Sequence, residues 1–305
     1  MKKRGQASAD FSHLSPALRA AAALPDSERV MRIRADRWIG YPRATAALQR
    51  LEALLNWPRK QRMPNLLISG PTNNGKSVVI EKFCRMHRAV GGDADRESVP
   101  IVAVQMPSDP SISRFYAMLL AALGAPLRPR SRTPELEHQA LALLRAVGTR
   151  LLIIDELHNI LAGPTRLQLE FLNLIRFLGN ELKIPIVGVG TKEAYLAIRS
   201  DSQLENRFEP VALPVWQDGE DLRSLLSSFA ASYPLRRPSV LGTENIARYL
   251  LARSEGTIGE LAQLLRAAAI AAIETGTEAI TAQTLTLAHY ESPSQRRQAF
   301  ERELA

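Results

Sequence analysis

The residues best suited to chemistry in this sequence are a lysine and a serine that end a glycine-containing stretch. Residues 70–77 read Gly-Pro-Thr-Asn-Asn-Gly-Lys-Ser, which fits the phosphate-binding pattern G-x-x-x-x-G-K-[ST]. The apolar run 66–69 precedes the pattern, and the amphipathic stretch 78–90 follows it. A strand that feeds such a loop and then a helix directs backbone N–H groups at phosphates. The context therefore favours a nucleotide site over a chance match.

Each position of this loop has an expected role. Lys76 would reach the β and γ phosphates, and the Ser77 hydroxyl would bind Mg²⁺. Asn74 stands where a glycine is common, and asparagine tolerates the left-handed backbone better than other non-glycine residues. The loop and helix positions predicted to contact the nucleotide are Gly70, Thr72, Asn73, Asn74, Gly75, Lys76, Ser77 and Val78.

A second pattern supplies two carboxylates. Four apolar residues, 151–154, are followed directly by Asp155 and Glu156. Ligands of open α/β sheets bind at the carboxyl ends of the strands, so we expect these acids beside the phosphate-binding loop. Asp155 would hold Mg²⁺ through water, and Glu156 would polarise the water that attacks the γ-phosphate. Together the two patterns predict an NTPase that uses Mg²⁺, and the choice of ATP depends on the family resemblance described below.

Strands and helices alternate around these motifs, as in a parallel sheet covered by helices on both faces. The predicted strands are 66–69, 100–104, 151–154, 184–189 and 210–213. The predicted helices among them are 44–55, 78–90, 111–123, 134–147, 167–181 and 192–198. After Pro214 the helical patterns 220–233, 243–254, 258–275 and 281–290 follow. The sequence therefore predicts an α/β fold with a C-terminal helical lid.

Composition limits the compartment. The chain has 305 residues, of which 46% are hydrophobic, as in an ordinary globular protein. Its single cysteine, Cys84, cannot form a disulfide within the chain, which indicates a reducing, cytoplasmic compartment. No apolar run approaches the ~18 residues that a membrane-spanning helix needs. The basic start lacks the apolar core of a signal peptide.

Positive charge is concentrated near the N-terminus. Residues 1–62 hold 13 Lys/Arg against 5 Asp/Glu, whereas the remainder holds 26 of each. Such an asymmetry suggests a polyanion such as DNA as a partner, but a solvated arm that only aids solubility would have the same composition. Residues 1–37 are expected to form loosely attached helices, and the Pro/Arg stretch 126–132 a mobile loop.

This order of elements resembles the AAA+ P-loop ATPases, and the resemblance implies further roles. Gly40 and Tyr41 lie where that class contacts adenine, unless Trp38 and Tyr41 are ordinary core aromatics. Thr191 occupies the sensor position, which touches the γ-phosphate or the attacking water. Arg207 occupies the position of an arginine finger that reaches the ATP of a neighbouring subunit, unless it forms only a surface ion pair.

The lid departs from that class in one place. A second sensor arginine is common there in Gly-x-x-Arg, but residues 256–259 read Gly-Thr-Ile-Gly. Weaker lid closure and slow hydrolysis would follow. The domains implied by the resemblance are a basic arm at 1–37, the nucleotide-binding core at 38–215, the lid at 216–290 and a polar, mobile tail at 291–305.

Several strings of residues look like those of the TniB family of transposition ATPases, which is related to TnsC and to the B protein of phage Mu. The strings are 62–68, 72–77, 154–159, 171–180 and 254–260, and the similarity runs from about Trp38 to Tyr290. Membership would imply an ATP-dependent regulator that assembles on double-stranded DNA as a ring or helical filament. The partners it implies are a DDE transposase of the TniA type and a TniQ-like targeting protein, and no membrane.

Members of this class hold DNA with residues that follow the second strand. Here that segment offers Ser111, Ser113 and Arg114, whose hydroxyls and cation suit phosphate contacts. Alternatively, Ser111 only caps the helix and Arg114 is solvated. His158 either couples the nucleotide site to DNA or is a structural hydrogen-bonding residue.

Two other functions remain open at this point. A helicase loader or remodelling ATPase would turn over ATP quickly, and the absent second sensor arginine counts against it. A signalling NTPase would bind proteins without DNA, and the positive charge of residues 1–62 counts against that.

Overall fold

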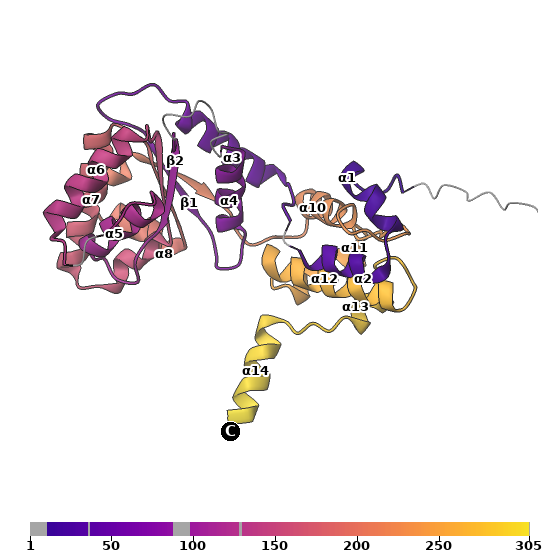
Figure 1. Ribbon diagram of the computed structural model, residues 1–305. Helices are drawn as coiled ribbons and strands as arrows, with labels where there is room; N and C mark the ends of the chain where they lie inside the picture. The colour runs from indigo at the N-terminus through magenta and orange to yellow at the C-terminus, as the bar shows by residue number, and fades with distance from the viewer. Residues whose placement is uncertain (1–10, 36, 88–97, 128–129, 305) are drawn as a thin grey trace, which may run out of the picture. The chain divides into compact units, whose positions relative to one another are not determined.

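The structure, a computed structural model, describes residues 11–35, 37–87, 98–127 and 130–304. The chain divides into two compact units. Arg43–Pro214 forms the α/β unit, which carries the sheet, and Met1–Pro42 with Val215–Ala305 forms the helical unit. Figure 1 shows the two units, coloured from indigo at the N-terminus to yellow at the C-terminus.

The predicted five-stranded parallel sheet is confirmed, and its strand order is β2-β3-β4-β1-β5. The strands are β1 Asn65–Ser69, β2 Ile101–Gln105, β3 Leu151–Asp155, β4 Ile186–Gly190 and β5 Phe208–Ala212. The central strands β1, β3 and β4 are almost wholly buried, as continuous apolar runs covered on both faces require. The outer strands β2 and β5 are partly exposed, and β5 contains Pro210, which an edge strand tolerates.

Helices cover both faces of the sheet, with α3 and α4 on one side of the strands and α5, α6 and α7 on the other (Figure 1). The helices are α3 Pro42–Leu55, α4 Lys76–Met86, α5 Ile112–Ala122, α6 Thr133–Ala146, η2 Leu157–Ala162, α7 Thr165–Leu182, α8 Lys192–Arg199 and α9 Ser202–Glu205. Each helix predicted for the core has a counterpart among them. Residues 88–90 of the helix expected at 78–90, and residues 128–129 of the expected loop, lie outside the described residues.

The helical unit contains segments from both ends of the chain. Its elements are α1 Pro16–Arg19, η1 Ala20–Ala23, α2 Asp26–Arg34, α10 Glu220–Ala230, α11 Glu244–Arg253, α12 Ile258–Glu274, α13 Ala282–Leu287 and α14 Pro293–Leu304. The predicted lid helices are thus present, and the Thr281 hydroxyl caps α13 by accepting from the backbone N–H of Thr284. Within the described residues no single helix is long and apolar enough to cross a membrane, although α11 and α12 meet that test jointly across a 115° bend.

The N-terminal segment differs from the loosely attached arm expected from its composition. Arg29 of α2 is fully buried, and its guanidinium donates to both carboxylate oxygens of Glu278 at 2.7 Å. It also donates to the carbonyl oxygen of Pro234 at 3.1 Å. The described residues before Pro42 therefore belong with the C-terminal helices, while residues 1–10 and 36 of the expected arm lie outside the described residues.

The C-terminal segment also differs from expectation. The tail expected to be mobile forms α14, none of whose residues is buried. Arg296 of α14 pairs with Glu260 of α12 at 2.7 Å, and Arg253 donates to the Gln295 side chain at 2.6 Å. These contacts hold α14 through charged and amide groups rather than through an apolar face.

We expect Glu278→Ala to lower the free energy of unfolding by about 3 kcal/mol, because removing one partner of a buried ion pair is strongly destabilising. Among the described residues, the buried Arg29 guanidinium would then keep only its ion pair with the exposed Asp26 carboxylate, at 2.7 Å, to balance its charge. Urea unfolding followed by circular dichroism measures the change, and Glu274→Ala, which removes an exposed carboxylate from the end of α12, is the control. Equal midpoints for the two variants would contradict a stabilising role for the Arg29–Glu278 pair.

The same pair makes stability depend on pH. Burial raises the pKa of Glu278, but hydrogen bonds from the Arg29 guanidinium and the Arg236 backbone N–H outweigh it and hold that pKa below its usual value. Because the folded pKa is lower than the unfolded value of about 4.3, the carboxylate stabilises the fold above that pH. Its contribution is lost as the pH falls through the folded pKa.

Candidate nucleotide site

The loop between β1 and α4 is shaped by two glycines. The backbone N–H of Gly70 donates to the carbonyl oxygen of Gly190 at 3.1 Å. A Cβ at Gly70 would lie 2.3 Å from the carbonyl oxygen of Leu213, so no larger residue fits there. Gly75 has φ 84°, the left-handed conformation that glycine adopts without strain, directly before α4. The two glycines thus fix the start and the end of the loop.

Asn74 does not have the role expected of it. The left-handed asparagine of the loop is Asn73, with φ 59°. The Asn74 side chain is instead buried, and its amide donates to the carbonyl oxygens of Leu213 at 2.7 Å and Pro214 at 2.8 Å. Its amide therefore ties the loop to the segment after β5, a contact that glycine at this position could not make.

Lys76 begins α4 and is held over the loop. Its ammonium donates to the carbonyl oxygens of Gly70 at 2.9 Å and Pro71 at 2.7 Å, and only 7% of the residue is exposed. Burial lowers the pKa of Lys76, opposed by the negative charges of Glu156 and Asp155, which raise it. Phosphate oxygens would replace the two carbonyls as stronger, charged acceptors. The neighbouring residues exposed to a ligand are Thr72, Asn73, Ser77 and Val78.

The Ser77 hydroxyl donates to Asp155 Oδ2 at 2.8 Å, which joins the first turn of α4 to the end of β3. The other oxygen of Asp155 accepts from the backbone N–H of Glu156 at 2.8 Å. Mg²⁺ in nucleotide sites is commonly held by one or two carboxylates together with substrate phosphates and water. One hydroxyl and one carboxylate at this spacing fit such an ion, with nucleotide phosphates and water completing the coordination. The described residues contain no cluster of three His, Cys, Asp or Glu side chains that would bind a metal alone.

Glu156 follows Asp155 in a left-handed backbone conformation, with φ 54°. A non-glycine residue held there is strained, and such residues cluster at functional sites. Its carboxylate pairs with His158 Nε2 at 3.1 Å. The close approach of His158 depends on Gly190, because a Cβ there would lie 3.3 Å from both His158 Nδ1 and its backbone nitrogen. His158 therefore positions Glu156, and the structure gives it no direct contact with Asp155.

Thr191 lies at the end of β4, beside the same edge of the sheet. Its carbonyl oxygen accepts from the Ser69 hydroxyl at 3.2 Å, which links it to the end of β1. Its own hydroxyl donates to the exposed Glu193 carboxylate. The structure thus brings Thr191 to the strand ends that carry the loop and Asp155, and its contact with the γ-phosphate stays a prediction.

Arg207 lies apart from these residues, directly before β5 and hence at the opposite, amino edge of the sheet. Its guanidinium donates to the side-chain oxygen of Asn180 on α7 at 2.9 Å. Burial and the neighbouring cations Arg62 and Arg176 lower its pKa, and Asp201 opposes them. Among the described residues Arg207 thus has a neutral partner and no ion pair, and its role as an arginine finger stays a prediction.

Gly40 and Tyr41 belong to the helical unit. The Tyr41 ring is 7% exposed and packs edge-on against Trp216, with the ring centroids 5.1 Å apart. Tyr41 is therefore an ordinary buried aromatic in this structure. Contact of Gly40 or Tyr41 with adenine stays a prediction.

Ser111, Ser113 and Arg114 lie together at the start of α5. The Ser111 hydroxyl accepts from the Arg114 backbone N–H, so it caps the helix. The Arg114 guanidinium forms an exposed ion pair with Asp109. These contacts agree with the alternative that Ser111 only caps the helix, and they show Arg114 in an exposed ion pair. They do not exclude DNA, because an exposed ion pair contributes only about 0–1 kcal/mol and a phosphate can replace it.

Comparison with known proteins finds one matching family and several solved structures that are similar to this chain. The family model described as "Bacterial TniB protein" matches residues 29–218. No curated protein sequence matches the chain. Among solved structures, the Aeropyrum pernix ORC1 protein in complex with DNA has a TM-score of 0.60 at 19% identity, covering 85% of this chain and 68% of that one.

Two further solved structures are similar to this chain. The ADPNP–ADP complexes of Aeropyrum pernix ORC2 have a TM-score of 0.57 at 16% identity and cover 84% of this chain and 70% of that one. Cdc6p from Pyrobaculum aerophilum has a TM-score of 0.55 at 16% identity, with 84% and 68% covered. At these identities the likeness establishes the fold, which is that of the AAA+ P-loop ATPases.

Proposed function

Because the chain belongs to the TniB family of AAA+ ATPases, we propose that it is an ATP-dependent, DNA-binding regulator of transposition. In this proposal it assembles with ATP and Mg²⁺ on double-stranded DNA as a ring or helical filament. The assembly recruits or activates a DDE transposase of the TniA type, together with a TniQ-like targeting protein. Hydrolysis is slow and times the release of the assembly.

The observation that carries the ATPase part is the Ser77–Asp155 hydrogen bond of 2.8 Å beneath the phosphate-binding loop. It brings the expected metal-binding hydroxyl to the expected metal-binding carboxylate, with Glu156 next along the chain. The Lys76 ammonium donates to two carbonyl oxygens of the same loop, where β and γ phosphates would be stronger acceptors. Catalysis of phosphoryl transfer is mainly such positioning and charge stabilisation.

The proposal that the chain binds DNA is supported by a structure of the same fold and by the charge of the chain. One structure of the same fold, Aeropyrum pernix ORC1, was determined in complex with DNA. This chain has a formal net charge of +8, all of it contributed by residues 1–62. A basic chain binds phosphates of any sequence and does so less tightly as salt rises.

One experiment separates the three functions under consideration. Binding of unrelated duplex DNA is measured over a range of salt concentrations, with and without a non-hydrolysable ATP analogue. A transposition regulator is expected to bind DNA only with the analogue and then to retain a TniA-like transposase on that DNA. ATP turnover is measured in parallel, with and without DNA, and fast turnover that DNA does not alter would favour a remodelling ATPase. No DNA binding in either condition would favour a signalling NTPase.

We expect Arg114→Ala to weaken ATP-dependent DNA binding about 5-fold per contact, since a hydrogen bond is worth about 1 kcal/mol. The loss is repeated in each subunit along a filament. It should affect all sequences alike and flatten the salt dependence, because phosphate contacts carry no sequence information. Fluorescence anisotropy of labelled duplexes at several salt concentrations measures both quantities.

Arg145→Ala is the matched control for this variant. Arg145 is 51% exposed and pairs with Glu181, much as Arg114 is 57% exposed and pairs with Asp109. If Arg114→Ala and Arg145→Ala bind DNA with the same affinity and salt slope, the start of α5 is not the DNA surface. The basic residues 1–62 then become the better candidate.

A further inference from the structure

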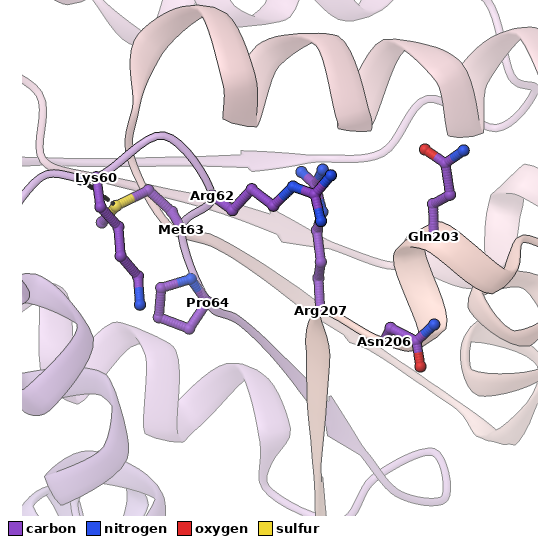
Figure 2. A pocket seen from close by; sticks show the side chains of 7 residues that line it. All are labelled: Lys60, Arg62, Met63, Pro64, Gln203, Asn206 and Arg207. Atoms are coloured by element: carbon purple, nitrogen blue, oxygen red, sulfur yellow. Dashed lines mark hydrogen bonds between the residues drawn. The ribbon is translucent and has the colours of Figure 1, made fainter.

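A cavity of about 500 Å³ lies in the α/β unit, away from the phosphate-binding loop (Figure 2). Its described lining residues include three cations and no carboxylate: they are Lys60, Arg62, Met63, Pro64, Gln203, Asn206 and Arg207. The nucleotide chemistry derived above uses only the last of them. A polar cavity with unbalanced positive charge is suited to an anion.

The fold brings the two arginines together from distant parts of the sequence. Arg62 lies in the segment before β1, and Arg207 lies directly before β5. These strands are parallel neighbours, and the backbone N–H of Asn65 donates to the carbonyl oxygen of Arg207 at 2.9 Å. Both side chains line the same cavity, and their guanidinium groups overlap in the view of Figure 2. Buried Met63 anchors the segment that carries Arg62, since it is 4% exposed.

Nothing among the described residues neutralises this pair. The Arg62 side chain has no hydrogen bond or ion pair there, and the Arg207 side chain has only the neutral Asn180 oxygen. The nearby carboxylate, Asp201, already accepts from two backbone N–H groups of α9 and pairs with Arg176 at 3.4 Å. Burial is the main cause of the lowered pKa of Arg207, and the positive charge of Arg62 lowers it further, as expected for two neighbouring cations. Such an arrangement costs free energy until an anion enters.

The anion cannot be the nucleotide of the same chain. The phosphate-binding loop follows the carboxyl end of β1, whereas Arg62 precedes its amino end. A five-residue strand spans roughly 16 Å, more than the length of an arginine side chain. A phosphate that reaches this cavity must come from another molecule.

This inference rests on the proposed function, in which Arg207 reaches the γ-phosphate of the ATP held by a second copy of the chain. We propose that Arg62 is a second arginine that binds the same γ-phosphate in this cavity. Two guanidinium groups from separate segments can each donate two hydrogen bonds to phosphate oxygens. The amides of Gln203 and Asn206 add neutral donors to the same cavity. The negative charge of the γ-phosphate would relieve the repulsion between Arg62 and Arg207. Assembly would therefore depend on bound ATP, because this relief is absent without the γ-phosphate.

The test compares Arg62→Ala with Arg59→Ala, which removes an exposed arginine from the same segment but outside this cavity. We expect the dilute Arg62→Ala chain to bind a fluorescent non-hydrolysable ATP analogue as wild type does. The concentration at which the analogue drives assembly, measured by sedimentation, should rise about 10- to 100-fold, as expected for a lost hydrogen bond to a charged group. Arg62→Lys should restore part of the loss. The urea midpoint of Arg62→Ala should not fall, because the Arg62 side chain makes no hydrogen bond to the residues that the structure describes.

Two results would overturn the inference. In one, Arg62→Ala assembles like Arg59→Ala. In the other, Arg62→Ala weakens DNA binding in the absence of nucleotide, which would assign the cavity to a DNA phosphate. Arg207→Ala, measured in parallel, separates this inference from the proposed function: if it alone impairs assembly, the function stands and the role of Arg62 fails. If wild type neither assembles nor binds DNA with the analogue, the proposed function fails and this inference fails with it.

Discussion

Glu156→Gln is expected to lower the rate of ATP hydrolysis about 10²–10⁴-fold while leaving ATP binding intact. The substitution keeps the shape of the side chain and removes the carboxylate that would polarise the attacking water. Asp155, which fits the metal, is untouched and keeps its hydrogen bond to Ser77. Single-turnover hydrolysis gives the rate, and titration with a fluorescent ATP analogue gives the affinity.

Two further variants serve as comparisons for Glu156→Gln. Lys76→Ala should lose ATP binding itself, because it removes the charge expected to meet the β and γ phosphates. Glu170→Gln, which alters an exposed carboxylate paired with Arg166 on α7, should resemble wild type in both measurements. Hydrolysis by Glu156→Gln at the wild-type rate would remove Glu156 from the catalytic role and leave its left-handed backbone without a functional explanation.

The sheet could be predicted from the sequence because its central strands are buried on both faces. Such strands are uninterrupted apolar runs, and β1, β3 and β4 begin and end within two residues of the expected positions. The edge strands β2 and β5 also begin and end within two residues of the expected positions, although they are partly exposed. The meeting of Ser77 and Asp155 was likewise predictable, because parallel strands end at one edge.

The remaining features depend on partners far away in the sequence. The burial of Arg29 depends on Glu278, which is 249 residues further along the chain, so composition alone predicts only loosely attached helices in that segment. The amide of Asn74 is used by carbonyl oxygens about 140 residues away, so the local pattern suggested only its backbone tolerance.

Arg62 shows the same limit at the second site. Composition groups its charge with those of residues 1–62, but its position beside Arg207 follows only from the pairing of β1 with β5. The signal available in the sequence was the basic segment at 59–62 directly before the first strand. It becomes informative only when the strand order is known.

Arg207→Ala is expected to lower ATP turnover about 10³–10⁵-fold, the range for loss of an arginine finger, without weakening ATP binding by the dilute chain. Arg207 precedes β5 at the edge of the sheet opposite to the phosphate-binding loop, so it can meet a transferring phosphoryl group only on another subunit. Assembly driven by a non-hydrolysable ATP analogue should fall as well. Steady-state hydrolysis and sedimentation measure the two effects.

Mixing subunits tests the direction of this contact. An Arg207→Ala subunit keeps Glu156, and a Glu156→Gln subunit keeps Arg207, so a mixed oligomer contains interfaces that unite both groups. Hydrolysis should therefore recover in part when the two inactive variants are combined, and adding Lys76→Ala to the Arg207→Ala subunit should abolish that recovery. Mixed oligomers that form but never hydrolyse ATP at any ratio would mean that Arg207 acts within its own chain. Its hydrogen bond to Asn180 would then be its function, as a link between β5 and α7.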